Sequence, residues 1–206
     1  MKVLLLNGST RQNGCTHTAL TEVAKAIQAE GLETELVWLG SQPAQDCVAC
    51  GSCARTGRCV FDDMVNTLAE KAAASDGFVF GTPVYYAHPS GQVLAILDRL
   101  FYSGARHFAG KPGAAVASAR RAGTTASLDA MNKYFTIAQM PVVSSTYWNM
   151  VHGTSPQEVL QDAEGLQTMR NLGRNMAWLI KCIRAGRDSG LTPPAIERGA
   201  WTNFIR

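Results

Sequence analysis

The stretch VLLLNGSTRQNGCTHT, residues 3–18, decides the fold. Its apolar start, Val3 to Leu6, ends at Asn7-Gly8-Ser9, a pattern that predicts a short buried strand closed by a turn. Beyond the polar remainder of the stretch, apolar residues recur at the spacing of one helix face, namely Leu20, Val23, Ala24 and Ile27. A buried strand that leads through a polar loop into an amphipathic helix is typical of the first unit of a parallel α/β sheet.

The same alternation continues along the chain. Strands are also expected at four short apolar or β-rich runs, residues 34–39, 78–82, 114–117 and 140–143. Helical patterns lie between these runs, and one of them is opened by the acidic pair Asp62-Asp63. The last predicted helix begins at the capping-box sequence Ser155-Pro156-Gln157-Glu158 and extends to about Gly186, with a break expected near Gly165 or Gly173. The sequence therefore predicts an α/β fold with a five-stranded parallel sheet and helices on both faces.

Size and composition indicate one ordinary globular domain, since the 206 residues are 46% apolar and 17% charged. We expect this domain over residues 1–185, with a cysteine-rich loop inserted at 47–59, followed by an extended tail over residues 186–206. The net charge of +3 is too small to favour nucleic acid or an acidic membrane surface as a partner. Because the chain has neither an apolar run of about eighteen residues nor a signal peptide, a cytoplasmic location without membrane contact is expected.

The polar part of the opening stretch is a candidate anion site. In open parallel sheets, ligands bind beyond the carboxyl ends of the strands, and a helix that starts there offers free backbone N–H groups. Hydroxyls at Ser9, Thr16 and Thr18 and the charge of Arg11 would suit a phosphate. The loop matches neither the Walker motif nor the dinucleotide glycine fingerprint. A polar turn with a helix cap stays the alternative interpretation.

Two further loops follow the third and fourth predicted strands. The first, residues 82–92, offers a rigid proline and the aromatic pair Tyr85-Tyr86. The second, residues 118–124, offers hydroxyls, arginines and a glycine. A planar, partly apolar ring with polar edges would suit this pair of loops. Alternatively, Tyr85 and Tyr86 cap the core, and Asp98-Arg99 in the following helix is a structural ion pair or a subunit contact.

Four of the six cysteines form the compact pattern Cys47-x2-Cys50-x2-Cys53-x5-Cys59, in a connection of about twenty residues. Three thiolates at steps of three residues can converge on one centre with a fourth to close it, as in a [4Fe–4S] cluster. A closed zinc site is the chief alternative, and unmetallated thiols are a third. Cys182, in the last predicted helix, is expected to be a small buried hydrophobic residue.

Taken together, these segments resemble the NADPH-dependent FMN reductase family and, within it, the iron-sulfur flavoproteins. The resemblance covers most of residues 1–185. It rests on Gly8-Ser9-Thr10-Arg11 with Thr16, Pro83-Val84-Tyr85, Ser90-Gly91-Gln92, Leu97-Asp98-Arg99 and the four clustered cysteines.

The resemblance implies a flavodoxin-like three-layer sandwich with strand order 2-1-3-4-5 and noncovalently bound FMN. The first loop would hold the phosphate, residues 83–86 would lie along the flavin, and residues 119–123 would flank its far side. Cys15 stands where the family commonly has asparagine, and Leu94 where it often has lysine. The implied cofactor contacts are Ser9, Arg11, Cys15, Thr16, Thr18, Pro83, Val84, Tyr85, Tyr86, Ala119, Arg120 and Gly123.

The function that the resemblance implies is an FMN-dependent oxidoreductase that passes electrons from NAD(P)H or ferredoxin to a small acceptor, with a [4Fe–4S] cluster at Cys47, Cys50, Cys53 and Cys59. No side chain is nominated as a catalytic acid or base. A homodimer or homotetramer is expected from the family and from the apolar tail residues Trp201, Phe204 and Ile205. Three alternatives stay open: a cluster-free NAD(P)H reductase of quinones or nitro compounds, a flavodoxin-like electron carrier, and a binding module ordered by zinc. Because flavodoxin-like carriers are commonly acidic, the mild basicity of this chain favours them less.

Overall fold

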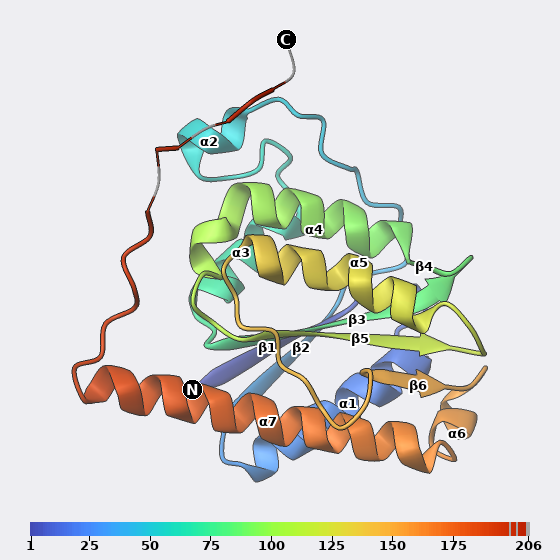
Figure 1. The fold of residues 1–206 in the computed structure, drawn as a ribbon. Coiled ribbons are helices and arrows are strands. Elements are labelled where there is room, and N and C mark those ends of the chain that lie inside the picture. Colours follow the sequence, from blue (N-terminus) through green and yellow to red (C-terminus); the bar gives the residue numbers. More distant parts are fainter. Residues whose placement is uncertain (198, 201, 205–206) are drawn as a thin grey trace.

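The central sheet of the computed structural model has its five main strands in the parallel order β2-β1-β3-β5-β6 (Figure 1). The structure describes residues 1–197, 199–200 and 202–204. The observed order confirms the predicted order 2-1-3-4-5. The strands are β1 (Lys2–Asn7), β2 (Glu33–Trp38), β3 (Gly77–Tyr85), β5 (Gly113–Ala119) and β6 (Met150–His152), and the short β4 (His88–Pro89) pairs antiparallel with the end of β3.

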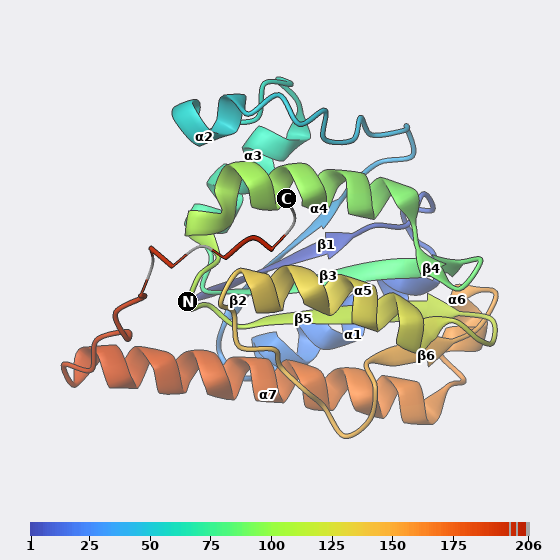
Figure 2. The same cartoon turned by 45° about the horizontal axis from the view of Figure 1, so that its top comes forward.

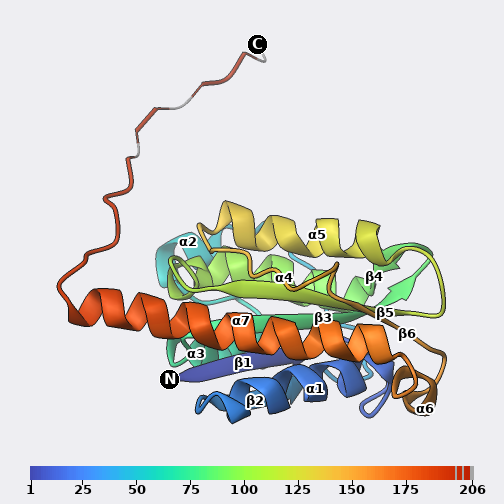
Figure 3. The ribbon, with the colours of Figure 1, turned by 60° about the horizontal axis from the view of Figure 1, so that its bottom comes forward.

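Helices cover both faces of this sheet. Figures 1 and 2 show α3, α4 and α5 on one face, with α2 outside α4, and Figure 3 shows α1 and α7 together on the other. The helices are α1 (Cys15–Ala29), α2 (Ser52–Thr56), α3 (Met64–Ala73), α4 (Gly91–Gly104), α5 (Thr124–Ile137), α6 (Pro156–Val159) and α7 (Ala163–Asp188), and a short 3-10 turn (Ala105–His107) follows α4.

The alternation of side chains along β1 produces two separate cores. Leu4 and Leu6 are fully buried in the core beneath α3, α4 and α5, whereas Val3 and Leu5 are fully buried against α1 and α7. A strand with both faces buried has a continuous apolar sequence. The apolar run at residues 3–6 therefore indicates a central strand of the sheet.

The fifth strand lies later in the chain than residues 140–143, where the sequence analysis placed it. That segment does run beside β5, since Gly113 N–H donates to Pro141 O at 3.0 Å and Val143 N–H to Gly113 O at 2.9 Å, but it forms only an isolated bridge. Residues 144–149 then leave the sheet, and regular pairing resumes at β6. Pro141 has no N–H to extend a ladder, and the apolar run reflects burial of Met140 and Val143 rather than strand pairing.

The last predicted helix is two helices. Ser155 caps α6 by accepting a hydrogen bond from Glu158 N–H at 3.3 Å, while the Glu158 carboxylate accepts from Thr154 instead of from Ser155. The break lies at residues 160–162, before Asp162 caps α7 through Gly165 N–H at 2.9 Å. The expected break near Gly165 is therefore found a few residues earlier in the chain, whereas Gly173 lies within α7.

The glycine at position 173 serves packing, because a Cβ there would lie 2.6 Å from Cβ of Ala26 in α1. The helix α7 extends to Asp188, slightly beyond the predicted domain limit, and Cys182 on it is exposed, so the prediction of a buried Cys182 was wrong. The described residues after α7 are exposed and form neither helix nor strand (Figure 3). Phe204 is among them, whereas Trp201 and Ile205 lie outside the described residues. In the described part of the chain, no helix combines the length and the hydropathy that a membrane span requires.

One charged contact ties the edge strand β2 to the domain and predicts a pH dependence of stability. Lys2 in β1 and Lys71 in α3 both contact the carboxylate of Glu35, and their hydrogen bonds lower the pKa of Glu35. A carboxyl group whose pKa is lower in the folded than in the unfolded protein stabilises the fold at pH values above its unfolded-state pKa. This contribution is lost as pH falls through the folded-state pKa. We expect Glu35→Gln to lower the free energy of unfolding by about 0.5–1 kcal/mol at neutral pH, as for other partly exposed pairs, and by less below about pH 4.

Urea unfolding at pH 7 and pH 3.5 measures this difference. The matched control is Glu30→Gln, since Glu30 pairs with Lys181 at the surface with about 41% of its side chain exposed. A deficit for Glu35→Gln that is the same at both pH values would contradict the prediction.

Candidate functional site

A cavity of about 520 Å³ opens at the carboxyl edge of the sheet, among the loops that follow β1, β3, β5 and β6. Eight of the twelve predicted cofactor contacts line it: Ser9, Arg11, Cys15, Thr16, Pro83, Val84, Tyr85 and Arg120. The other lining residues are Asn13, Gly14, Ser118, Gly153, Thr154 and Pro156.

The loop after β1 is shaped by hydrogen bonds among its own residues. Asn7 Oδ1 accepts from Ser9 N–H at 3.1 Å and Asn7 Nδ2 donates to Gln12 O at 2.9 Å. Ser9 Oγ in turn accepts from Arg11 N–H at 3.1 Å. The helix α1 then begins after Gly14 with no side-chain cap and no acidic residue in its first turn. Its first N–H groups and the helix dipole therefore favour an anion in the cavity.

Two side chains at the start of α1 connect this loop to the far side of the cavity. The hydroxyls of Thr16 and Ser118, both buried, lie 2.8 Å apart and join α1 to the end of β5. The Cys15 thiol donates to Gly153 O at 3.6 Å. Burial raises the pKa of Cys15, so this side chain adds no negative charge beside a bound anion at neutral pH.

The apolar wall of the cavity comes from the β3–β4 hairpin. Pro83, Val84 and Tyr85 line the cavity, whereas Tyr86 is fully exposed at the tip of the hairpin. Tyr86 and Ala87 both have positive φ values, 49° and 62°. At such positions in β-hairpin turns, glycine or asparagine is the usual residue. A tight turn built from side-chain-bearing residues is strained, and such strain is commonly found beside binding sites.

The four predicted contacts outside the lining are Thr18, Tyr86, Ala119 and Gly123. Thr18 Oγ1 donates to Gly14 O at 3.2 Å within α1, and Ala119 is buried at the end of β5. Gly123 has φ of 98° and packs against the hairpin, where an added Cβ would lie 2.6 Å from Cα of Ala87. Gly123 therefore sets the distance between the loop after β5 and the hairpin.

Sequence reasoning missed the segment Gly153 to Pro156. Ligand-binding loops were expected only after the first, third and fourth strands, and the fifth strand was itself expected at residues 140–143, before the true strand β6. The short apolar pair Met150-Val151 followed by His152-Gly153-Thr154 was the available signal, since strand-to-loop transitions in this sheet end at the same edge.

All four clustered cysteines line a second cavity, of about 480 Å³. Its floor is the carboxyl-terminal half of α4, with Asp98, Arg99, Tyr102 and Ser103. The cysteine loop passes over this floor through α2, which has no buried residue and is flanked by Gly51 and Gly57 with φ of 68° and 70°. The six cysteines of the chain are all free thiols. The two cavities thus lie toward opposite ends of α4, since β4 precedes that helix and α2 covers its far end (Figure 1).

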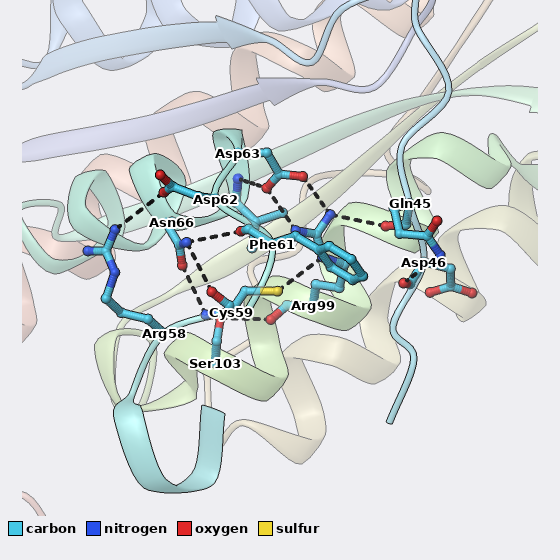
Figure 4. Close-up of polar contacts among 11 residues, drawn as sticks. Gln45, Asp46, Arg58, Cys59, Phe61, Asp62, Asp63, Asn66, Arg99 and Ser103 are labelled. Atoms are coloured by element: carbon cyan, nitrogen blue, oxygen red, sulfur yellow. Dashed lines mark hydrogen bonds and ion pairs between the residues drawn. The ribbon is translucent and has the colours of Figure 1, made fainter. Parts of the chain in front are cut away.

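Cys59 is fixed to the domain more firmly than its three partners. Asn66 in α3 accepts from Cys59 N–H at 3.0 Å and donates to Cys59 O at 3.2 Å, which clamps the backbone of the cysteine. Arg99 Nε lies 3.2 Å from Cys59 Sγ and donates to it (Figure 4). The sequence analysis expected Arg99 in a structural ion pair, and its guanidinium does pair with Asp63, whereas Asp98 accepts from Tyr134 OH at 2.5 Å.

The donors that line this cavity are thiols, which as thiolates bind both iron-sulfur clusters and zinc. Within the described residues, no three His, Cys, Asp or Glu side chains are grouped closely enough to hold one metal ion. Four thiols nevertheless share one cavity, and thiolates are the ligands of iron-sulfur clusters.

Comparison with known proteins agrees with this geometry. The family model for NADPH-dependent FMN reductase matches residues 1–155. An iron-sulfur flavoprotein of Methanocaldococcus jannaschii is 32% identical over 193 residues, which cover 89% of this chain and 100% of the relative. An iron-sulfur flavoprotein of Methanosarcina thermophila is 27% identical over 192 residues, covering 91% of this chain and 100% of the relative.

A solved archaeal flavodoxin superposes with a TM-score of 0.61 at 15% identity, covering 88% of this chain and 99% of the flavodoxin. This likeness shows the flavodoxin-like fold that the resemblance of the sequence implied. The match of the family model to three quarters of the chain, together with the full-length relatives, establishes that this chain belongs to the NADPH-dependent FMN reductase family and is related to the iron-sulfur flavoproteins.

Proposed function

We propose that this protein is an FMN-dependent oxidoreductase of the cytoplasm that passes electrons from NAD(P)H or ferredoxin to a small acceptor and holds a [4Fe–4S] cluster at Cys47, Cys50, Cys53 and Cys59. The observation that carries the proposal is that these four thiols line one cavity of a domain whose other cavity suits a flavin nucleotide. When bound, FMN would supply hydride and one-electron chemistry, and the cluster would supply one-electron transfer.

The chain's own residues would bind and orient these groups. Ser9, Arg11 and Thr16, with the first N–H groups of α1, would hold the FMN phosphate. Residues 83–85 would lie along one side of the flavin ring and Arg120 on the opposite side of the cavity. Direct contacts from Thr18, Tyr86, Ala119 and Gly123 are not part of the proposal, because these residues do not line the cavity.

The separation of the two cavities bears on the route of the electrons. Because the cavities lie toward opposite ends of α4, we propose that the cluster exchanges electrons with a ferredoxin or with the flavin of a neighbouring subunit. A homodimer or homotetramer is therefore part of the proposal. Light scattering at micromolar concentration tests it, and a monomer would contradict it.

The proposed function is tested by anaerobic purification, a visible spectrum and measurement of iron, sulfide, zinc and FMN per chain. We expect about four iron, four sulfide and one FMN, as a [4Fe–4S] flavoprotein requires. FMN without iron or zinc would replace the proposal by a cluster-free reductase, and stoichiometric zinc without flavin by a zinc-ordered module. Turnover of NADPH with quinone, nitro and ferredoxin acceptors then separates an enzyme from an electron carrier, because a carrier would oxidise no NADPH.

The proposed phosphate site predicts the effect of one arginine. We expect Arg11→Gln to weaken FMN binding about tenfold, the lower end for loss of a charged hydrogen bond, because Arg11 is exposed and partly screened by salt. The free energy of unfolding of the Arg11→Gln variant should differ from that of the wild type by less than about 0.5 kcal/mol. Quenching of FMN fluorescence at low and high salt measures the affinity, and the loss should shrink at high salt.

The matched control for Arg11→Gln is Arg121→Gln. Arg121 is also exposed and lies beside Arg120, but it does not line the cavity. Equal losses of FMN affinity in the two variants would show that the effect of Arg11 comes from overall charge rather than from a phosphate contact.

A further inference from the structure

Arg99 is a buried charged side chain that faces the cysteine cavity from α4. Only 2% of the residue is exposed, and its guanidinium lies over the ring of Phe61, 4.9 Å from the ring centre. Its two terminal nitrogens each lie 2.8 Å from an oxygen of Asp63, and Nη1 also donates to Gln45 O at 3.1 Å. Figure 4 shows these partners converging on Arg99 from both ends of the cysteine loop.

The pairing with Asp63 fixes the direction of the remaining donor. A carboxylate that accepts from both terminal nitrogens holds the planar guanidinium in one orientation. The Nε–H group then points at Cys59 Sγ, 3.2 Å away. Partial burial acts to raise the pKa of Asp63, but the hydrogen bonds from Arg99 and from Val65 N–H outweigh it and lower that pKa, so the pair is ionised at neutral pH.

The acceptor is equally well fixed. Asn66 clamps the backbone of Cys59 on both sides, and Asn66 is itself buried. The sulfur of Cys59 therefore meets a charged donor that is held by Asp63 and by the backbone of Gln45. In the described contacts of Cys47, Cys50 and Cys53, no side chain donates to a sulfur.

We propose that Arg99 is a positioning residue that holds Cys59 as the anchoring ligand of the cluster and raises the reduction potential of the cluster through the Nε–H to Sγ hydrogen bond. This inference rests on the proposed function. One-electron reduction adds negative charge at the thiolate ligands without a proton, so a fixed donor at one sulfur favours the reduced state. Because Asp63 largely offsets the charge of Arg99, we expect the hydrogen bond to change the reduction potential of the cluster more than the net charge does.

The test compares Arg99→Lys with the matched control Arg58→Lys in the anaerobically reconstituted full chain. Lysine keeps a positive charge but lacks the fork that contacts Asp63 and Cys59 together. Arg58 lies in the same loop, is about 55% exposed in its side chain, and pairs with Glu70 rather than with a cysteine. Iron per chain is measured first, and the midpoint potential of the cluster is then determined by stepwise reduction with dithionite, followed by electron paramagnetic resonance.

We expect Arg99→Lys to shift the one-electron reduction equilibrium about tenfold toward the oxidised cluster, which is about 59 mV for a one-electron couple, and Arg58→Lys to leave it unchanged. A loaded Arg99→Lys protein whose equilibrium lies within about twofold of the wild type would overturn the inference. A merely structural role of Arg99 would change iron content but not the potential of the molecules that are loaded.

A second variant decides the matter if Arg99→Lys does not hold iron. Asp63→Glu keeps Arg99 and the charge of the pair but lengthens the side chain that holds the guanidinium, which displaces Nε–H from Cys59 Sγ, so the reduction potential should fall. An unchanged or raised potential in an iron-loaded Asp63→Glu protein would then overturn the inference. If the wild-type chain itself takes up no iron and sulfide, the proposed function fails first and the inference falls with it, which separates the two failures.

Discussion

Replacing Cys53 by alanine is expected to reduce the iron bound per chain from about four atoms to less than half of that number, while FMN occupancy stays unchanged. The cluster would keep only three of its four thiolate ligands. The loop around Cys53 has little structure of its own to compensate, since the five-residue helix α2 buries no side chain. Helices this short are marginal in water, so α2 contributes little stability of its own to the loop.

The matched control for Cys53→Ala is Cys182→Ala. Cys182 is an exposed thiol on α7, on the opposite face of the sheet from α4. Iron and sulfide analysis after anaerobic reconstitution, with FMN released and measured from the same sample, gives both occupancies. Full iron content in Cys53→Ala would rule out the proposed ligand set, and loss of iron in both variants would point to non-specific thiol binding.

Replacing Gly123 by alanine is expected to lower the free energy of unfolding by about 2–3 kcal/mol and to weaken FMN binding more than tenfold. A side chain at positive φ costs about 1–2 kcal/mol, and φ is 98° here. The added Cβ would also lie 2.6 Å from Cα of Ala87 and 2.8 Å from Cγ1 of Val84. A backbone atom cannot rotate away as a side chain can, so the hairpin that carries Pro83 to Tyr85 must move.

Gly91→Ala is the matched control for Gly123→Ala. Gly91 is the first residue of α4 at the same edge of the sheet, and an added Cβ would meet no atom within 4 Å. Alanine there should be neutral or slightly stabilising, by up to about 1 kcal/mol. Urea unfolding and FMN fluorescence titration measure both effects. Similar stability and affinity in the two variants would show that Gly123 does not set the position of the hairpin.

Those parts of the fold that depend on burial could be predicted from the sequence. The runs at residues 3–6 and 78–82 are apolar on both sides because each strand contacts a core on either face, so their composition reports their position. The run at residues 140–143 is apolar for a different reason. Met140 and Val143 are buried beside the start of β5, but Pro141 and the following polar residues interrupt the ladder. Apolar composition predicts burial, and only backbone hydrogen bonding distinguishes a strand from a buried loop.

For the two cavities, the residues that could be predicted are those that are close together in the sequence. Ser9, Arg11 and Thr16 could be predicted because they belong to one strand-to-helix connection, whose ligand-binding edge follows from the sheet topology. The contact between Arg99 and Cys59 could not, since 40 residues separate them and no local pattern joins α4 to the cysteine loop. Gln45 in the loop after β2, with Asp63 and Asn66 at the start of α3, completes that environment.

The cysteine loop has a consequence for how such proteins can diverge. Residues 41–58 contain no buried side chain, and Gln92 Nε2 holds the carbonyls of Leu39 and Gly40 where the loop leaves the sheet, at 2.9 and 3.0 Å. A descendant could therefore shorten or lose this segment and keep both cores and the cavity at the carboxyl edge intact. Such a loss would change the environment of Arg99, because its hydrogen bonds to Gln45 and Cys59 would be lost while the ion pair with Asp63 remained. In a lineage that has discarded the cysteines, that buried arginine is the position where compensating substitutions should accumulate.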